Sequence, residues 1–573
     1  MNKNTNLFLA VAIWLGCMLA LYTFFPGVVG AKKQPSHQAP AEAAAPTPAP
    51  APQPAPDGTA AAPRPTDVPR GTQARPPTRL VTFETPRARV VVTSDGAAVQ
   101  SVQLLGSKWT QHKGSGEEAQ VDLVGVRAGE ALPYSTLVKG AAEQVLVPAD
   151  TGYQLLRQDA TSAAFRAEQG GLTITKTLSV DPQTYAIRLG VEVRSSAPVS
   201  GQLAVLEGTH ALEPAGGLFS PHTNTPARAI CLAAGNKVER MAVGAKTPIW
   251  EGQGAQFAGL DEQYFLTAVM PPAGVPATCR LEAKGEKSGS LTSFLLVPLQ
   301  IPAGGTAQLA FTGYAGPKTD SELTPVGAPL KHSIEWGFWS VIAEVLLAIM
   351  KFFHGVVPGH NWGVAIILLT VAMKLLTFPL QHKSMKSMQE MQRIQPQLEE
   401  MKKKYAGDTQ RQNVEQMKLF KEHGVNPMGS CLPMLIQMPI WFALYTTLQV
   451  SVELYNEPFI PAWIGDLTSK DPYYVLPVAM GITMILTQVL TPAPMSNPSQ
   501  KTMGYVMSGF FSLLMLTLPS GLTLYIFTNN ILSIAQQMYL RRTLKKPPAS
   551  GQTIEVQKKK GGGPDSQRAK QPA

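Results

Sequence analysis

Hydrophobic and polar positions divide the chain into two unlike parts. From Leu80 to about Lys318, apolar residues alternate with polar ones in short runs such as RARVVVTSDGAAVQSVQLLG, and Asp-Gly, Asp-Pro and Gly-Gly pairs separate the runs. Alternation with a period of two is typical of strands that bury one face, and those pairs are typical of turns. The pattern predicts an all-β sandwich domain in residues 80–320.

The rest of the chain carries apolar runs long enough to cross a bilayer. We predict five spans within residues 358–542, at 362–380, 431–450, 473–490, 503–518 and 522–540. The run 7–25 predicts an uncleaved anchor in residues 1–30, because about nineteen apolar residues exceed the core of a signal peptide. A lipoprotein signal that ends at Cys17 is the alternative. The expected fold is therefore multidomain: a polytopic α-helical membrane protein of six spans with a β-sandwich domain.

Shorter segments connect and flank these parts. Residues 31–79 are rich in Pro and Ala and predict a disordered linker, and residues 543–573 predict a basic disordered tail. Residues 330–357 place Glu344 and Lys351 among apolar residues, which favours an amphipathic helix at the membrane interface over a further span. In residues 381–430, apolar residues recur at steps of three and four around a break at Gly407-Asp408, which predicts a hairpin of two helices.

Lysine and arginine are unevenly distributed along the 573 residues, whose net charge is +10. Residues 381–430 hold nine of them and the tail from Arg541 holds nine more, whereas residues 453–471 hold only Lys470 against four acidic residues. Positively charged loops of membrane proteins face the cytoplasm. We therefore expect a multi-pass protein of the bacterial inner membrane, with both termini and the hairpin cytoplasmic and the β domain periplasmic.

The sequence offers little to hold a metal or a cofactor. No CxxC pair, Cys/His ligand spacing or phosphate-binding P-loop is present, so we expect neither metal nor cofactor. Cys231 and Cys279 could pair if the β domain lies outside the cytosol. An enzyme in the β domain is an alternative function, and its candidate residues are His210, Glu213 and His222.

A single lysine, Lys374, lies inside the span 362–380. A charge at that depth costs roughly 2.5 to 3.5 kcal/mol on insertion scales, so it is expected to face protein or water, although a lysine that snorkels to the cytoplasmic interface is the alternative. Thr370 lies one turn earlier on the same face. The later spans also carry polar residues, which either bond between helices or line a groove with Lys374: Gln437, Thr483, Thr487, Gln488, Thr528, Asn529 and Asn530.

The run VNPMGSCLPMLIQMPIWFALY (425–445), with DPYYVLPVAMG, LPSGLTLYIFTNN and the basic tail, closely resembles the YidC family of membrane protein insertases, which is related to the Oxa and Alb proteins of organelles. The resemblance implies a hydrophilic groove with a positive residue, usually arginine, and Lys374 occupies that place. Lysine keeps the charge without the planar fork of arginine. Thr370 matches a groove threonine, and the bulky contact of the last span falls near Tyr525 and Ile526. The β domain of such proteins is similar to sugar-mutarotase sandwiches.

The resemblance implies that the protein is no enzyme. It would move nascent inner-membrane proteins from the cytoplasm into the bilayer through the groove, alone or with the Sec translocon, without nucleotide hydrolysis. The expected partners are nascent membrane proteins, the ribosome, Sec translocon components and membrane lipids, but not DNA. A secondary transporter is the alternative, although its usual repeated halves are absent from the sequence.

Three groups of residues are expected to carry this function. The groove residues are Lys374, Thr370, Gln437, Gln488, Tyr525, Thr528 and Asn529. The substrate-receiving residues of the hairpin are Met385, Met388, Met391, Met401 and Met417, since methionine adapts to many apolar partners. The residues that contact the ribosome or lipid are Arg541, Arg542, Lys545, Lys546, Lys558, Lys559 and Lys560.

Overall fold

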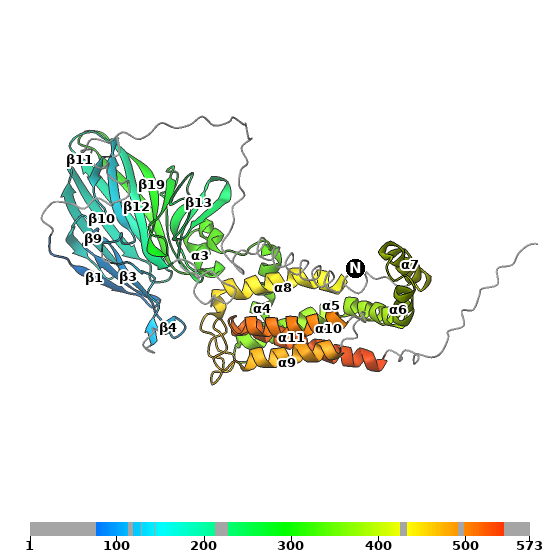
Figure 1. The fold of residues 1–573 in the computed structure, drawn as a ribbon. Coiled ribbons are helices and arrows are strands. Elements are labelled where there is room, and N and C mark those ends of the chain that lie inside the picture. The colour runs from blue at the N-terminus through cyan, green and yellow to red at the C-terminus, as the bar shows by residue number, and fades with distance from the viewer. Residues whose placement is uncertain are drawn as a thin grey trace, which may run out of the picture.

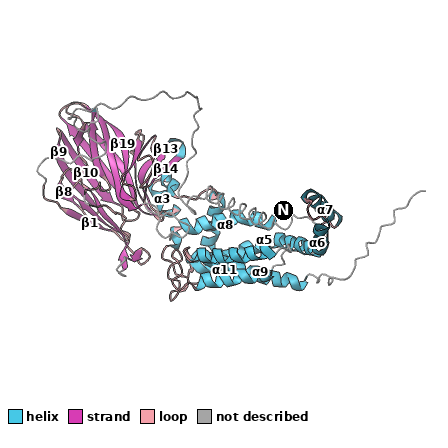
Figure 2. Ribbon diagram, viewed as in Figure 1, coloured by secondary structure: helices cyan, strands magenta, loops and turns pink. Residues whose placement is uncertain are grey.

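The computed structural model describes residues 76–112, 118–127, 129–141, 144–212, 227–424, 432–490 and 498–543. The predicted anchor, nearly all of the linker and the tail from residue 544 lie outside the described residues. The described chain forms a β domain, from β1 to β20, and a helical region that extends away from it (Figure 1). Strands occupy the β domain and long helices occupy the other region (Figure 2).

The β domain is built on two antiparallel sheets. The larger sheet has the strand order β14-β13-β16-β17-β20-β11-β10-β9-β8. Its strands are β8 (Gln154–Gln158), β9 (Ser162–Gln169), β10 (Leu172–Val180), β11 (Ala186–Ser195), β13 (Arg228–Ala233), β14 (Lys237–Met241), β16 (Phe257–Asp261), β17 (Phe265–Met270) and β20 (Thr306–Pro317). Alternate residues of β10 are buried, as the alternation in the sequence predicts.

The second sheet has the order β15-β18-β19-β12-β6-β7. Its strands are β6 (Ser135–Gly140), β7 (Val145–Val147), β12 (Val199–Leu212), β15 (Ile249–Gln253), β18 (Thr278–Ala283) and β19 (Ser288–Ile301). One apolar core draws side chains from both sheets, and a disulfide between Cys231 of β13 and Cys279 of β18 joins them. The predicted β sandwich is therefore confirmed, and the two cysteines that could pair do so.

Two smaller sheets complete the β domain. A three-stranded sheet contains β1 (Leu80–Glu84), β2 (Ala88–Thr93) and β3 (Ala98–Leu104), and a two-stranded one contains β4 (Thr110–His112) and β5 (Glu118–Gln120). The turn before β4 contacts the helical region, so this small sheet is one point at which the β domain meets the bundle. The turn between β16 and β17 is another, where Gln263 Nε2 donates to the Gln449 carbonyl at 3.0 Å.

Helix α3 (Asp320–Val326) follows β20 directly and still packs on the β domain, whose core includes Leu323. The helices of the helical region are α4 (Ser340–Val356), α5 (Trp362–Arg393), α6 (Gln395–Lys404), α7 (Thr409–Glu422), α8 (Leu432–Val450), α9 (Val475–Leu490), α10 (Pro498–Met515) and α11 (Ser520–Thr543). Each of the five spans predicted within residues 358–542 corresponds to a helix. Among the described residues, Trp362–Ser384 alone is both long and apolar enough to cross a membrane, and α9 and α10 contain shorter apolar stretches.

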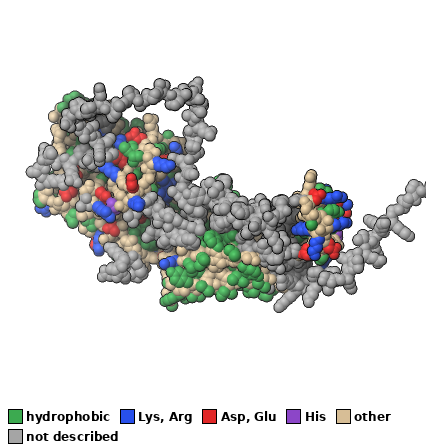
Figure 3. Space-filling view, in the orientation of Figure 1, with side chains coloured by type: hydrophobic (Ala, Val, Ile, Leu, Met, Phe, Trp, Pro, Cys, Tyr) green, Lys and Arg blue, Asp and Glu red, His purple; other side chains and the backbone are tan. Residues whose placement is uncertain are grey.

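Helices α4, α5 and α8 to α11 form a bundle with its own apolar core. Within it, α11 packs against α5 and α9, α9 packs against α10, and α4 packs against α5 and α8. Hydrophobic side chains cover much of the visible bundle surface, whereas charged ones gather on the β domain and on α6 and α7 (Figure 3). An apolar belt between two polar ends is the surface that a bilayer requires of a spanning protein.

Two boundaries differ from the sequence-based expectation. The helix that contains the first span does not end near Leu380 but continues to Arg393, so the helix pair itself consists only of α6 and α7. The sequence after Pro379 holds good helix formers and no Gly, and the helix breaks only before Pro396 at the start of α6. The predicted amphipathic helix begins later, at Ser340, because Gly337 lies in the left-handed region with φ 70°.

The loop between α8 and α9 (residues 451–474) covers one end of the bundle. Ile464 and Leu467 are buried in the bundle core, and Phe459 lies against Gly363 at the start of α5. The β domain contacts this loop: Asn456 Nδ2 donates to the Thr110 carbonyl at 2.6 Å, and the ring of Tyr455 stacks on Trp109 at 5.9 Å. The bundle is therefore closed at the end that faces the β domain.

Candidate functional site

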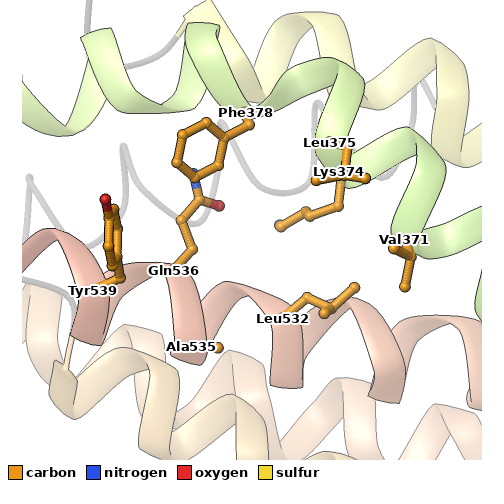
Figure 4. Close-up of a pocket in the computed structure, with 8 residues that line it drawn as sticks. All are labelled: Val371, Lys374, Leu375, Phe378, Leu532, Ala535, Gln536 and Tyr539. Atoms are coloured by element: carbon orange, nitrogen blue, oxygen red, sulfur yellow. The ribbon is translucent and has the colours of Figure 1, made fainter.

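A pocket of about 370 Å³ lies between α5 and α11 (Figure 4). Its lining residues are Val371, Lys374, Leu375 and Phe378 from α5 and Leu532, Ala535, Gln536 and Tyr539 from α11. Within each helix these residues are separated by three or four positions, so each set forms one face. Leu375 is 68% exposed at the edge of the pocket, which therefore opens to the outside of the bundle.

Lys374 is half-buried and points toward α11. Its Nζ donates to Ser533 Oγ at 2.7 Å and to Asn529 Oδ1 at 3.3 Å. The sequence has no Asp or Glu from Trp362 to Gln389, nor in α8, α9, α10 or α11. The ammonium is thus held by neutral oxygen atoms, and α8 to α11 supply no negative charge.

The other predicted groove residues lie apart from the pocket. Thr370 is buried and donates to the Ile366 carbonyl of its own helix at 2.7 Å. Gln437 Nε2 donates to Tyr525 Oη at 3.3 Å, and this pair joins α8 to α11. Tyr525 itself is buried in the bundle core.

The remaining two lie on different faces of the bundle. Gln488 Oε1 accepts from Ser508 Oγ at 3.1 Å, which joins α9 to α10. Thr528 is half-buried on α11, next in sequence to Asn529. Of the predicted groove residues, the structure therefore brings Asn529 alone into hydrogen-bond contact with Lys374.

Sequence reasoning missed Ser533 and Gln536. They follow Asn529 by four and seven positions on α11, so the three residues form a polar stripe on one face. That spacing is visible in the sequence and could have identified both. A serine within a span usually bonds to its own backbone, and the predicted groove residues include no serine. The stripe faces Lys374 and the pocket.

Helices α6 and α7 pack against each other at the far end of the bundle from the β domain (Figure 1). Ile394 and Phe420 form their small core, and Met391 packs against it. Met401 is half-buried, while Met417 and Val414 of α7 are 53% and 62% exposed one turn apart. The side chains of Met385 and Met388 lie outside the described residues.

The remaining candidates are the basic residues expected to contact the ribosome or lipid and the three candidates of the β domain. Arg541 and Arg542 end α11 with side chains outside the described residues, as are Lys545, Lys546, Lys558, Lys559 and Lys560. His210 pairs with Glu130, Nδ1 to Oε1 at 2.8 Å, while Glu213 and His222 are not described. In the part of the chain that the structure describes, no group of three or more His, Cys, Asp or Glu residues could hold a metal ion.

Two family models match the chain. Residues 80–349 match the YidC periplasmic domain, and residues 352–547 match the 60Kd inner membrane protein family. The membrane protein insertase YidC of Anaeromyxobacter sp. (strain Fw109-5) is 42% identical over 488 residues, which cover 82% of this chain and 86% of the relative. The YidC insertase of Geobacter sulfurreducens is 38% identical over 387 residues, 66% of this chain and 70% of the relative.

Among solved structures, an active YidC insertase with its first transmembrane domain resolved matches 80% of this chain and 92% of its own, with 17% identity and a TM-score of 0.35. A galactose mutarotase related enzyme from Lactobacillus acidophilus matches 42% of this chain and 99% of its own, with a TM-score of 0.28. At these TM-scores neither likeness establishes a shared fold. The matches support neither a transporter nor a sugar-active enzyme, and at 42% identity over most of both sequences the chain belongs to the YidC family of membrane protein insertases.

Proposed function

We propose that the pocket between α5 and α11 receives the polar segment of a nascent inner-membrane protein while the apolar segment of the same protein moves sideways into lipid. The observation that carries this proposal is Lys374: a cation inside the bundle whose partners are two neutral oxygen atoms. A charge that the fold does not neutralise is costly to keep in a membrane protein, and such residues mark pathways. Lys374 would attract acidic residues of the passing segment.

The driving force needs no nucleotide. Transfer of an apolar segment of about 20 residues into the hydrocarbon supplies roughly 25 cal/mol for each Å² removed from water. The opposing term is the cost of moving the polar segment through a medium without hydrogen-bond partners. A pocket with an ammonium and amide groups lowers this cost, so burial of the apolar part can complete the step.

The polarity of the molecule supports entry from the cytoplasm. With the β domain in the periplasm, α6 and α7 at the opposite end of the bundle would be cytoplasmic, as would both termini of a six-span chain (Figure 1). The exposed Val414 and Met417 of α7 offer an apolar surface to an emerging segment. The basic tail would hold ribosomal RNA or anionic lipid by a salt-sensitive contact, with Sec translocon components as further partners.

The closed end of the bundle supports release into lipid rather than through a channel. The α8–α9 loop covers the ends of α5 and α11, where the backbone N–H of Gly521 donates to Leu467 O at 2.9 Å. The pocket is instead open at its side, beside the exposed Leu375 and Leu376. A substrate that enters the pocket therefore meets the bilayer before it meets the periplasm.

Substitution of Lys374 tests this proposal. Lys374→Ala should reduce insertion of a single-span substrate with acidic residues in its translocated segment by at least about tenfold, while Lys374→Arg keeps insertion, because charge rather than shape is required. Lys383→Ala is the matched control, since Lys383 is an exposed lysine further along α5. Insertion is measured by protease protection in proteoliposomes that contain the full-length protein. Normal insertion by the alanine variant would overturn the proposal.

A further inference from the structure

Ser533 lies beside the pocket and contacts Lys374, which lines it. Its Oγ accepts from Lys374 Nζ at 2.7 Å and donates to the carbonyl of Asn529 at 2.7 Å, one turn back on the same helix. The side chain of Asn529 accepts a second bond from the same ammonium at 3.3 Å. A hydroxyl whose proton is engaged by a backbone carbonyl turns its lone pairs outward, and in this way it becomes a fixed acceptor.

The positions of Lys374 and Ser533 along their helices indicate what the contact between them does. Lys374 lies about 18 Å along α5 from Trp362, and Ser533 lies about 20 Å along α11 from Ser520. Both helices start at the α8–α9 loop, so the two residues are at the same level of the bundle. The ammonium therefore reaches straight across the crevice. A lysine with no acceptor there would bend toward the polar end of α5, where Gln381, His382 and Lys383 follow.

We propose that Ser533 is a positioning residue for Lys374: together with Asn529 it keeps the ammonium inside the pocket and prevents it from snorkelling to the membrane surface. An ammonium has three N–H donors, and the two residues of α11 engage two of them. The third donor stays available to an oxygen atom of a passing segment. Ser533 thus acts through Lys374 and makes no contact with substrate of its own.

The positioning role of Ser533 rests on the proposed function of Lys374, but the contact between the two residues can be tested separately. The full-length protein in proteoliposomes is treated with a water-soluble acylating reagent, and acylation of Lys374 relative to Lys383 is measured by mass spectrometry. Ser533→Ala removes the acceptor, and Ser533→Thr keeps a hydroxyl. Ser512→Ala is the matched control, because Ser512 also donates to a carbonyl four residues back, at 2.9 Å, on α10 and away from any lysine.

We expect Ser533→Ala to raise the relative acylation of Lys374 on the order of tenfold, since a hydrogen bond to a charged group is among the stronger ones. Ser533→Thr and Ser512→Ala should stay at the wild-type value. In the insertion assay, Ser533→Ala should lose activity several-fold and Ser533→Thr should regain it. Equal acylation of Lys374 in the wild type and in Ser533→Ala would overturn the proposal, whatever the insertion activity.

The two proposals fail in different ways. If Lys374→Ala inserts normally while Ser533→Ala still raises acylation, the proposed function is wrong and the positioning role stands. If Lys374→Ala abolishes insertion while Ser533→Ala leaves acylation unchanged, the charge is required and Ser533 does not position it. A variant whose bundle fails to fold is recognised because Lys108, whose Nζ is held by Glu457 and by the Glu453 carbonyl of the α8–α9 loop, would become more reactive as well.

Discussion

Asp261 of the β domain and Lys374 of the helix bundle are both charged residues withdrawn from water, and their surroundings accommodate the charge in opposite ways. In the β domain, Asp261 has a fully buried side chain and accepts from Lys318 at 2.7 Å, Arg240 at 2.8 Å and Arg228 at 2.9 Å. In the bundle, Lys374 has only Ser533 and Asn529. Lys176 of the β domain is also held by neutral oxygen atoms, the carbonyls of Gly96 and Tyr134, but it is fully buried. Lys374 differs from both, because it has no counter-charge and lines an open pocket, where it can interact with another molecule.

The network around Asp261 shows what the matched charge does. Arg228 also contacts Glu335 at 2.9 Å, and Arg240 donates to the Ser333 carbonyl at 2.9 Å. Both of these partners lie in the segment that leads from β20 to α4. The cluster therefore fastens the connection between the β domain and the bundle, and a change within it should affect stability rather than insertion chemistry.

The largest effect is expected for Asp261→Asn. The substitution leaves two arginines and a lysine buried around a neutral side chain, and removal of one member of a buried ion pair costs about 3–5 kcal/mol. We expect the free energy of unfolding of the β domain to fall by about that amount, measured by chemical denaturation of the full-length protein in detergent. Asp320→Asn is the control, because its pair with Lys331 is exposed and contributes little. Equal stability of the two variants would contradict the role of the cluster.

The same carboxylate predicts a loss of stability in acid. Burial alone would raise the pKa of Asp261, but Lys318, Arg228 and Arg240 outweigh it and lower the pKa from 3.8 to about 2. Because the folded state binds the proton more weakly than the unfolded state, the contribution is complete above pH 4 and is lost as the pH falls from about 4 to 2. It amounts to about 2.5 kcal/mol. Unfolding measured across this range should show the slope in the wild type and a smaller slope in Asp261→Asn.

Much of this architecture could be predicted from sequence because it depends on local patterns. Alternation predicted the sandwich, and runs of about 20 apolar residues predicted where the bundle helices lie. The contact between Lys374 and Asn529 could also be predicted, since a cation in one span is expected to meet polar groups of another span. The sequence does not show which face of each helix points toward Lys374. Thr370 and Gln488 are polar residues in spans like Asn529, yet they bond to Ile366 and Ser508.

Which polar residue meets which depends on the rotation and neighbours of whole helices, and no local pattern encodes these. The partners of Asp261 show the same limit. Arg228, Arg240 and Lys318 are separated by up to 90 positions in the sequence, and only the pairing of β13 with β14 and β16 brings two of them to Asp261. The end of α5 differs from the prediction for another reason: polarity marks where a span leaves the membrane, but it does not end a helix.

Lys374→Met tests the bundle half of the comparison with Asp261. It should change stability less than Asp261→Asn does, and it should not lower it. Methionine keeps the length and apolar stem of lysine but removes a half-buried cation that has no counter-charge. We expect the unfolding free energy of the bundle to stay the same or to rise by about 1 kcal/mol, while insertion is impaired. Lys383→Met, on the exposed part of α5, is the control. A clear loss of stability in Lys374→Met would mean that the lysine serves the fold, as Asp261 does.

The smallest effect concerns the ion pair that links the two regions. Lys108, before β4, lies 2.9 Å from Glu457 of the α8–α9 loop and also donates to the Glu453 carbonyl at 2.7 Å. Both side chains are about two-thirds buried, so this pair is intermediate between the Asp261 cluster and an exposed pair. A double-mutant cycle with Lys108→Ala and Glu457→Ala should give a coupling energy of about 0.5–1 kcal/mol in the unfolding of the full-length protein. Zero coupling would mean that this ion pair does not stabilise the contact between the β domain and the loop. The junction would then depend on its other contacts, such as those of Asn456, Tyr455 and Gln263.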